Sequence, residues 1–386
     1  MLRFKAVGFF LLVPCILLAQ IRPGAERMDQ YLHLLKGKRV GIIANRASVV
    51  NGMNIVDTLL LSGVKVQKIF SPEHGFRGFV EAGQNIENFS DPQTGLPVIS
   101  LYGNSKKPTV NDLKDLDIMI FDIQDVGVRF FTYISTLTCV MEACAENHLP
   151  MILLDRPNPN GFYIDGPVLE FGYRSFIGMH PVPIVYGMTI GEYAGMVNGQ
   201  GWLKGGIRCK ITVIRNDKYS HRYRYMLPAK PSPNLFSMNA VYLYPSLCLF
   251  EGTMMSVGRG TLFPFEVFGH PDWKSCSFTY VPKGIQDVSL HPLYEGLPCL
   301  GIDLRGITLA HPEYLGSIQL SWLIAAYADL GSNPDFFNDY FDKLAGTSKL
   351  KNQIIQGLPE EEIKKTWQND LARFKQIRSK YLLYPD

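Results

Sequence analysis

The chain has 386 residues, of which 46% are hydrophobic and 19% are charged, and this composition is that of a globular protein with a sizeable core. The formal net charge is +3 and the lysines and arginines are scattered, so the charge does not indicate a nucleic-acid-binding protein. No low-complexity tract or block of like charge occurs, and the length predicts more than one domain.

Residues 1–19 differ from the rest of the chain, and we predict that they form a secretory signal peptide. Arg3 and Lys5 precede an apolar run that ends at Ala19, where we expect cleavage. The run is short for a membrane span, which argues against a permanent anchor. Cys15 suggests a lipoprotein, but the proline before it does not suit that processing. We therefore expect an exported protein located in the periplasm, with a lipoprotein or a secreted protein as the lesser alternatives.

Six cysteines follow this segment. Their spacing is irregular and no CxxC pair occurs, so the sequence predicts neither a disulfide scaffold nor a structural zinc site. Most of them have apolar neighbours, which is typical of buried free thiols. The six are Cys139, Cys144, Cys209, Cys248, Cys276 and Cys299.

The first part of the mature chain alternates between apolar runs and segments with helical spacing. Continuous apolar strands joined by helices are typical of a parallel sheet that is covered on both faces, so the sequence predicts an α/β domain. Thr189 and Glu192 have the spacing of a capping box at a helix start. The predicted strands cover residues 39–44, 64–70, 97–101, 116–123, 151–154 and 208–215, and the predicted helices cover residues 55–62, 129–147, 189–203 and 240–250.

Further along the chain, short strand-like pieces with prolines precede several helices. This change of pattern predicts a second, smaller α+β domain that lines or closes a crevice. We place the boundary near Leu262, which gives a larger domain over residues 20–262 and a smaller one over residues 263–386. In the smaller domain we expect strands at residues 278–281 and 300–304 and helices at residues 314–330, 335–343 and 360–381.

Polar side chains gather directly after the predicted strands. Because the carboxyl ends of parallel strands lie at one edge of a sheet, groups far apart in the sequence are expected to converge on one crevice. Five such groups occur, and five polar groups at strand ends are harder to attribute to chance than one. They are Asn45 with Arg46, Glu73 with His74, Tyr102, Asp122 with Asp125, and Asp155 with Arg156 and Asn158.

The stretch from Ser71 to Gly78 carries the most varied chemistry of these groups. After a proline it places a carboxylate, an imidazole and a guanidinium within five residues, Glu73, His74 and Arg77. Capping or a salt bridge would explain Glu73 alone, but its neighbours and its place at a strand end favour catalysis. His74 by itself is typical of a structural hydrogen bond, and beside Glu73 a contact with substrate is an equal alternative. We predict that both residues are catalytic.

A second carboxylate is needed if the site cleaves glycosidic bonds, because that chemistry commonly uses two acidic groups in one cleft. Asp122 lies inside an apolar run, which is unusual for a purely solvated aspartate. Glu251 closes an apolar segment before a glycine-rich turn, a setting that resembles that of Glu73. Both are therefore catalytic candidates, whereas Asp125 can also be interpreted as the cap of the helix that follows it.

Arginines near the strand ends could hold a carboxylate or a phosphate of the ligand. Structural pairing with nearby aspartates is the competing interpretation for Arg46, Arg129 and Arg156, and we expect it to apply to at least one of them. The residues that we predict to contact the substrate are Asn45, Arg46, Arg77, Asp125, Arg129, Tyr133, Arg156, Asn158 and Arg259.

Several common types of site lack their motifs in this sequence. No GxGxxG follows the first strand, no GxSxG occurs, and residues 258–261 lack the Gly-Lys-Ser/Thr spacing of a P-loop. A metal site is an alternative, although no HxH or HxxxH spacing occurs, and we expect no cofactor and no bound metal. The ligands of such a metal site would be Glu73, His74, Asp122 and Asp125.

A series of motifs runs through most of the mature chain: SPEHGFRG (71–78), FDIQDVGVRFFTY (121–133), LDRPNP (154–159), PSPN (231–234), FEGT (250–253), GRGT (258–261) and KYLLY (380–384). Each motif alone is weakly specific, but the set in this order is highly specific. Together they resemble the family long known as domain of unknown function 1343. Its characterised members are exo-β-N-acetylmuramidases, which remove terminal N-acetylmuramic acid from peptidoglycan fragments.

The resemblance implies a Rossmann-like larger domain, a smaller C-terminal domain and a cleft between them. It implies saccharides that end in N-acetylmuramic acid as substrates, and the lactyl carboxylate of this sugar would explain arginines in a sugar site. Aromatic side chains in the motifs would pack against the pyranose face. Glu73, in the Pro-Glu-His-Gly motif, would protonate the glycosidic oxygen, while Asp122, Glu251 or the 2-acetamido group of the substrate would act opposite.

Two functions of other classes stay open. A non-catalytic binding protein for muropeptides would need the same cleft without turnover. A metal-dependent hydrolase of another cell-wall ester or amide would use the metal alternative described above.

Overall fold

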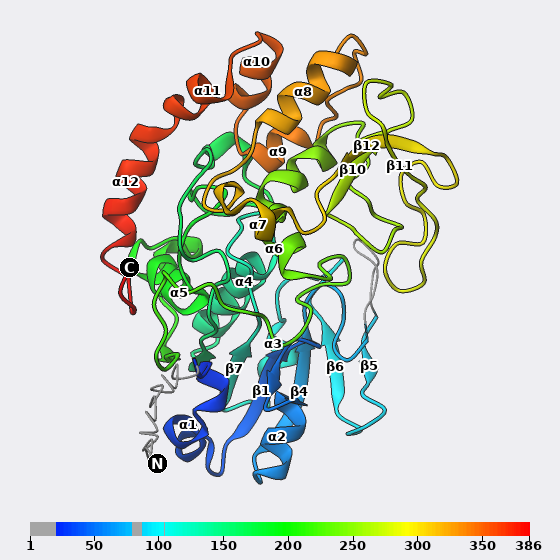
Figure 1. Ribbon diagram of the computed structural model, residues 1–386. Coiled ribbons are helices and arrows are strands. Elements are labelled where there is room, and N and C mark those ends of the chain that lie inside the picture. The colour runs from blue at the N-terminus through cyan, green and yellow to red at the C-terminus, as the bar shows by residue number, and fades with distance from the viewer. Residues whose placement is uncertain (1–20, 79–86, 104) are drawn as a thin grey trace, which may run out of the picture.

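The computed structural model describes residues 21–78, 87–103 and 105–386, so the predicted signal peptide lies outside the described residues. The main element is a seven-stranded sheet with the order β5-β6-β4-β1-β7-β8-β9 (Figure 1). A separate antiparallel pair, β2 (Val49–Val50) and β3 (Met53–Asn54), follows β1. The seven strands are β1 (Arg39–Ala44), β4 (Lys65–Ser71), β5 (Phe89–Ser90), β6 (Pro97–Ser100), β7 (Ile118–Asp122), β8 (Met151–Leu154) and β9 (Ile211–Ile214).

All strands of this sheet except β5 at its edge run parallel. The chain passes from β1 outward to β4 and β6, returns to β7 on the other side of β1, and continues to β8 and β9. This is the strand order of the Rossmann fold. The predicted parallel α/β sheet is confirmed, and the loops after β1, β4 and β7 meet where the strand order reverses, which is where such sheets bind ligands.

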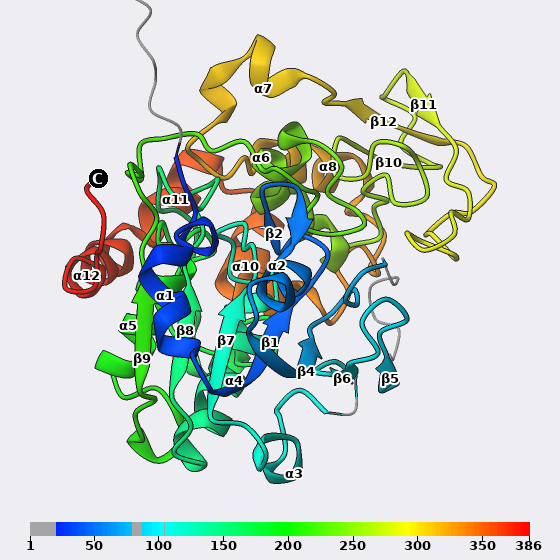
Figure 2. The same ribbon diagram turned by 90° about the horizontal axis from the view of Figure 1, so that it is seen from below.

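Alternating side chains of the strands point into two separate hydrophobic cores. In β1, Val40 and Ile42 belong to the core under the first two helices, whereas Ile43 belongs to the opposite core under the next three. Burial on both faces explains why the strands are continuous apolar runs in the sequence. The helices on the first face are α1 (Met28–Leu35) and α2 (Ile55–Leu61), and those on the second are α3 (Val110–Leu113), α4 (Tyr133–Glu146) and α5 (Ile190–Gly199) (Figure 2).

Two of these helices start in ways that bear on the site. Thr189 and Glu192 form the predicted capping box of α5: the Glu192 N–H donates to Thr189 Oγ1 (3.3 Å) and the Thr189 N–H donates to Glu192 Oε2 (2.9 Å). Helix α4 starts at Tyr133 and not at the predicted residue 129, because Arg129 turns into the interior. The N-cap residue Thr132 makes no side-chain hydrogen bond to its own helix, which leaves its hydroxyl for another partner.

The C-terminal part contains a three-stranded antiparallel sheet with the order β10-β12-β11 and a series of helices, as the predicted α+β pattern requires (Figure 1). Strand β10 and helices α7 and α10 were not predicted. The elements after β9 are α6 (Met238–Leu247), β10 (Val267–His270), β11 (Phe278–Tyr280), β12 (Cys299–Asp303), α7 (Ile307–Ala310), α8 (Ser321–Leu330), α9 (Phe341–Ala345), α10 (Lys349–Ile355), α11 (Glu360–Thr366) and α12 (Gln368–Arg378).

The predicted helix over residues 360–381 is in fact two helices, α11 and α12, which meet at Trp367. The backbone of Trp367 has φ −102° and ψ 0°, which is outside the helical region. Its indole Nε1 donates to Asp165 Oδ1 (3.2 Å), and both residues are buried. This tertiary hydrogen bond explains a break that the amphipathic pattern of the sequence does not reveal.

One hydrophobic core joins the sheet domain to the C-terminal part. It includes Tyr133 of α4 and Tyr193 of α5 together with Phe250, Trp322 and Leu371 from the second half of the chain. The two parts therefore pack directly on each other. The domain boundary that we place after residue 262 stays a prediction.

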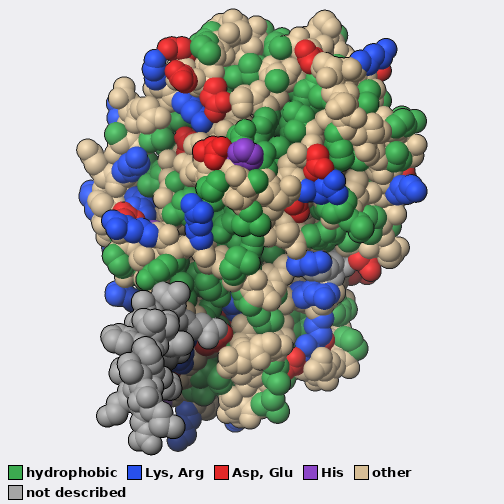
Figure 3. Space-filling view, in the orientation of Figure 1, with side chains coloured by type: hydrophobic (Ala, Val, Ile, Leu, Met, Phe, Trp, Pro, Cys, Tyr) green, Lys and Arg blue, Asp and Glu red, His purple; other side chains and the backbone are tan. Residues whose placement is uncertain are grey.

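Lysine and arginine side chains lie in small groups among acidic and apolar ones on the face shown in Figure 3. Of the helices that the structure describes, none has the length and apolar character needed to cross a membrane. All six cysteines of the described residues are free thiols.

Asp155, directly after β8, is a fully buried carboxyl group. It accepts hydrogen bonds from Thr189 Oγ1 (2.8 Å), the Gly191 N–H (2.8 Å) and Tyr384 Oη (2.6 Å). Burial raises the pKa of Asp155 from 3.8 to about 7, although the hydrogen bond from Tyr384 lowers it. Because the folded pKa lies above the ordinary value, folding favours the protonated form of Asp155.

The contribution of Asp155 to stability should be complete below about pH 4 and should be lost as the pH rises through about 7. We expect Asp155→Asn to remove up to about 1.4 kcal/mol per pH unit of this slope in urea unfolding between pH 5 and 8. Asp117→Asn is the control, because the hydrogen bond from Arg39 lowers the pKa of Asp117 to about 2. An unchanged slope in Asp155→Asn would show that another group titrates.

Candidate active site

A cavity of about 430 Å³ lies where the loops after the parallel strands meet the C-terminal part. Its volume is in the range of small-molecule sites. The sheet domain contributes Glu73, His74, Tyr102, Lys106, Thr132 and Tyr133 to the lining, and the second half of the chain contributes Tyr244, Glu251, Arg259, Phe265, Tyr340 and Leu344.

Glu73 follows β4, which ends at Ser71, and it is half-buried in the cavity wall. A turn forms after the strand, in which the Gly75 N–H donates to the Pro72 carbonyl (3.3 Å). His74 has φ +74°, a left-handed conformation that a residue other than glycine rarely adopts. The turn thereby directs both predicted catalytic side chains into the cavity.

A hydrogen bond fixes the Glu73 carboxyl group against α4. Thr132 Oγ1 donates to Glu73 Oε2 (2.7 Å), so the hydroxyl that does not cap α4 instead orients the carboxyl group. The N-terminus of this 14-residue helix carries a partial positive charge beside Glu73. The loop after β4 therefore reaches across β1 to the segment after β7, and the sheet places the acid at the reversal of the strand order.

Tyr133 lies next to this pair and is held on two sides. Its hydroxyl accepts from Asn45 Nδ2 (3.0 Å) and donates to the Pro231 carbonyl (3.2 Å). Burial raises the pKa of Tyr133, and the charge of Glu73 raises it further. Asn45, a predicted contact residue, is buried and does not line the cavity, and it lies behind Tyr133.

Glu251 is the second carboxylate of the lining, and it comes from the short helical turn at residues 248–252. Arg259 Nε donates to Glu251 Oε1 (2.6 Å), and Cys248 Sγ donates to Glu251 Oε2 (3.5 Å). Burial raises the pKa of Tyr340, the residue before α9, and the charges of Cys248, Glu251 and Glu73 raise it further. Tyr340 therefore lies in the field of both carboxylates.

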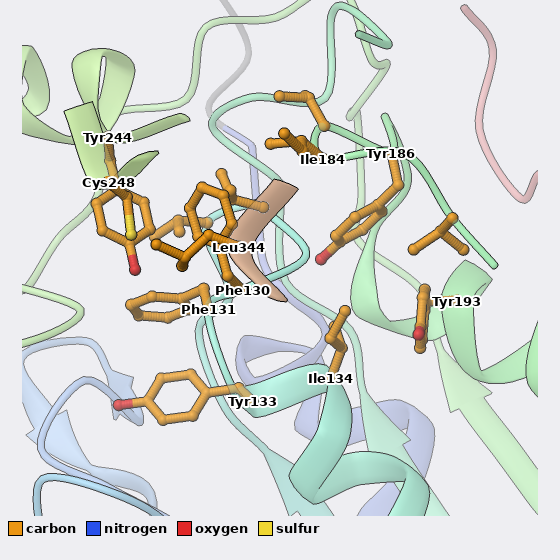
Figure 4. Close-up of a cluster of buried hydrophobic side chains, with 14 of the residues drawn as sticks. Phe130, Phe131, Tyr133, Ile134, Ile184, Tyr186, Tyr193, Tyr244, Cys248 and Leu344 are labelled. Atoms are coloured by element: carbon orange, nitrogen blue, oxygen red, sulfur yellow. The ribbon is translucent and has the colours of Figure 1, made fainter. Parts of the chain in front are cut away.

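Aromatic rings form much of the remaining wall. Phe130 and Phe131 lie edge-on to Tyr244, with ring centroids 5.5 and 5.9 Å apart, and Tyr244 lies edge-on to Phe265 at 5.0 Å. Figure 4 shows the first three of these rings together with Leu344 of α9. Such a wall offers ring faces and edges against which a pyranose can pack.

Asp122, predicted as a catalytic carboxylate, does not line the cavity. It is the last residue of β7 and is fully buried, and Arg156 donates to both of its oxygens, from Nε (2.6 Å) and from Nη2 (2.8 Å). The pair is closed off from the cavity, so neither the predicted catalytic role of Asp122 nor the predicted substrate contact of Arg156 agrees with their position. Structural pairing is the interpretation that holds for both.

Arg129 is likewise an interior residue. Its Nη1 donates to the carbonyls of Pro167 and Val182 (both 2.9 Å), and its Nη2 donates to those of Leu344 and Ala345 (both 2.8 Å). Because these bonds occupy both terminal nitrogens of the guanidinium and the side chain is fully buried, Arg129 does not reach the cavity.

Tyr133 and Arg259 line the cavity as predicted, whereas four further predicted contacts lie outside the lining. Arg77 donates to Asp57 and Asp91, so it ties the loop after β4 to its neighbours. Asp125 is buried and accepts from Tyr186 Oη and the Gly127 N–H, and burial raises its pKa to about 6. Of the remaining two, Asn158 is buried and Arg46 is exposed, and neither lines the cavity.

Thr132, Tyr340 and Lys106 are among the cavity residues that the sequence interpretation missed. Thr132 lies within the motif at residues 121–133 and could have been recognised as a helix start. Tyr340 lies in the C-terminal part and carries no local signal, and Lys106 follows a strand end but was not selected. Among the residues that the structure describes, no group of three or more His, Cys, Asp and Glu side chains has the arrangement of a metal site.

Comparison with known proteins assigns a family to this architecture. The family model described as exo-beta-N-acetylmuramidase NamZ, N-terminal, matches residues 40–239, and the corresponding C-terminal model matches residues 242–384. The chain belongs to the exo-β-N-acetylmuramidase NamZ family. A relative from Bacillus subtilis (strain 168), named peptidoglycan beta-N-acetylmuramidase NamZ, is 37% identical over an alignment of 375 residues that covers 92% of this chain and 89% of the relative.

Two crystal structures of DUF1343 family proteins from Bacteroides fragilis NCTC 9343 have the same fold. One is 43% identical with a TM-score of 0.89 and covers 95% of this chain and 100% of its own. The other is 30% identical with a TM-score of 0.77 and covers 94% of this chain and 99% of its own. The resemblance to this family seen in the sequence is thus confirmed, and the NamZ fold carries the cavity described above.

The buried ion pair predicts a stability effect that separates Asp122 from the cavity carboxylates. Asp122→Asn leaves the charge of Arg156 buried without a counter-charge, so we expect a loss of about 3–5 kcal/mol in the free energy of unfolding. Glu73→Gln, at a half-buried position in the same NamZ fold, should cost about 1 kcal/mol or less in the same urea titration. If Asp122→Asn keeps its stability but loses turnover, Asp122 is a catalytic residue after all and the structural interpretation is wrong.

Proposed function

We propose that this chain is an exo-acting β-N-acetylmuramidase that hydrolyses terminal non-reducing N-acetylmuramic acid from peptidoglycan fragments. The observation that carries the proposal is the cavity with two carboxylates, Glu73 and Glu251, in a chain matched by both NamZ family models. The Bacillus subtilis relative carries the name of a peptidoglycan β-N-acetylmuramidase. The aromatic wall suits a pyranose, since such rings pack against its apolar face.

In this mechanism Glu73 is the general acid. Its protonated carboxyl group gives a proton to the glycosidic oxygen as the bond from that oxygen to C1 breaks, so the leaving sugar departs as an alcohol. The hydrogen bond from Thr132 occupies Oε2 (2.7 Å) and so leaves Oε1 to face the substrate. His74, beside Glu73 in the lining, stays a predicted participant in the same step.

Glu251 is the group that we assign to the opposite side of the sugar. Among the described residues of the lining it is the other carboxylate, and Arg259 and Cys248 fix both of its oxygens. In this position Glu251 activates a water molecule or supports attack by the 2-acetamido group of the substrate. The interior position of Asp122 removes it from this role.

We also propose that the protein is exported and acts in the periplasm. The support is the pattern of residues 1–19, where two basic residues precede an apolar run that ends at Ala19. Fractionation of cells that express the full chain, followed by N-terminal sequencing, should find the chain in the periplasm with Gln20 as its first residue. Retention of the first nineteen residues in the cytoplasm would contradict the proposal.

The acid role of Glu73 predicts a dependence on the leaving group. We expect Glu73→Gln to lower kcat by roughly 10²–10⁴-fold on a disaccharide that ends in N-acetylmuramic acid. On 4-nitrophenyl β-N-acetylmuraminide the loss should be much smaller, because nitrophenolate leaves without a proton. Equal losses on both substrates would contradict the acid role, and the absence of any release from the muraminide by the wild-type chain would contradict the muramidase function.

Two further measurements separate the alternative functions. A non-catalytic binding protein would retain bound muropeptide without turnover in the wild-type chain, which calorimetry and product analysis detect together. A metal-dependent hydrolase would lose activity after treatment with a chelator, whereas we expect the rate of muraminide cleavage to stay unchanged.

A further inference from the structure

The proposed muramidase function requires a group that holds the lactyl carboxylate of N-acetylmuramic acid, and the arginines that the sequence suggests are occupied elsewhere. Arg77 and Arg156 are paired with aspartates, and Arg129 donates to backbone carbonyls. In the cavity, the guanidinium of Arg259 lies 2.6 Å from Glu251, so its charge is already compensated. A carboxylate that enters the cavity therefore needs another cation.

Lys106 is such a cation, and it lies in the loop after β6 in the lining of the cavity. Its Nζ lies 4.4 Å from the centroid of the Phe176 ring, which also lines the cavity. Within the part of the chain that the structure describes, this exposed ammonium has no ion-pair partner. The neighbouring Lys107, by contrast, is paired with Glu142 (3.3 Å) and Glu146 (2.8 Å).

We propose that Lys106 binds the lactyl carboxylate of the substrate and thereby makes the cavity selective for N-acetylmuramic acid over N-acetylglucosamine. The two sugars differ only in the lactyl ether on C3. A charge-assisted hydrogen bond from one ammonium is therefore sufficient to distinguish them. Lys106 is a specificity-determining residue in this assignment and takes no part in bond cleavage.

The position of Lys106 in the fold agrees with this role. Strand β6 lies next to β4 in the sheet, so the loop that carries Lys106 follows the neighbour of the strand that leads to Glu73. The acid acts on the oxygen at C1 and the cation on the group at C3, so adjacent loops reach two positions of one pyranose ring. Phe176 orients the ammonium without neutralising it, because an aromatic ring has a quadrupole and no net charge.

The test compares 4-nitrophenyl β-N-acetylmuraminide with the same compound converted to its lactyl amide, which keeps the shape but not the charge. The wild-type chain should prefer the acid. In Lys106→Met, which retains an aliphatic stem over Phe176, kcat/KM for the acid should fall roughly 10- to 100-fold, mainly through KM, as expected for the loss of a hydrogen bond to a charged group. The rate with the amide should stay unchanged, and Lys106→Arg should restore most of the preference.

Lys230→Met is the matched control, because Lys230 lies at the same 4.4 Å from an aromatic ring, that of Phe236, outside the cavity. It should leave both rates unchanged. Inhibition by free N-acetylmuramic acid should weaken in Lys106→Met, while inhibition by N-acetylglucosamine should not change. If the ratio of kcat/KM for the acid to kcat/KM for the amide is the same in Lys106→Met as in the wild type, this proposal is overturned and the muramidase function is left intact. An inactive wild-type chain overturns the muramidase function itself.

Discussion

The guanidinium of Arg129 lies in the interior where the loops after the sheet meet α9, and the far wall of the cavity depends on this contact. It donates to carbonyls on both sides of the junction, those of Pro167 and Val182 and those of Leu344 and Ala345 at the end of α9. The residue after Ala345, Gly346, has φ +79°, and a Cβ atom there would lie 2.6 Å from Arg129 Nη2. Because Leu344 of α9 and Tyr340, the residue before α9, line the cavity, this clamp sets their distance from the carboxylates.

Burial decides which charged residues near the strand ends face the cavity and which hold the loops in place. A fully buried charge is stable only with a close partner, and Asp122 with Arg156 satisfies this condition through two short hydrogen bonds. Asp155 instead shifts toward its neutral form, since burial raises its pKa to about 7. Glu73 and Glu251 keep partial exposure and line the cavity.

The sequence predicts the positions of strands better than the roles of polar residues. β1 and β8 have the predicted bounds because runs buried on both faces are apolar throughout, and the capping box at Thr189 is a purely local signal. The edge at which Glu73 lies follows from parallel topology alone. Whether a side chain such as that of Arg129 points to the interior or to the cavity depends on tertiary packing, as does the break at Trp367. Neither leaves a pattern in the sequence.

The availability of a cation to a ligand depends on how strongly the protein already holds it. Separating a buried pair such as Arg156 and Asp122 costs about 3–5 kcal/mol, which exceeds the roughly 1.5–3 kcal/mol that a charge-assisted hydrogen bond to a ligand returns. A cation–π contact at an exposed site contributes only about 0.5–1 kcal/mol. A substrate carboxylate can therefore draw the Lys106 ammonium from the Phe176 ring with a net gain. Lys106 is the cation suited to bind the substrate carboxylate because its contact with the Phe176 ring is weak, and not because of its charge alone.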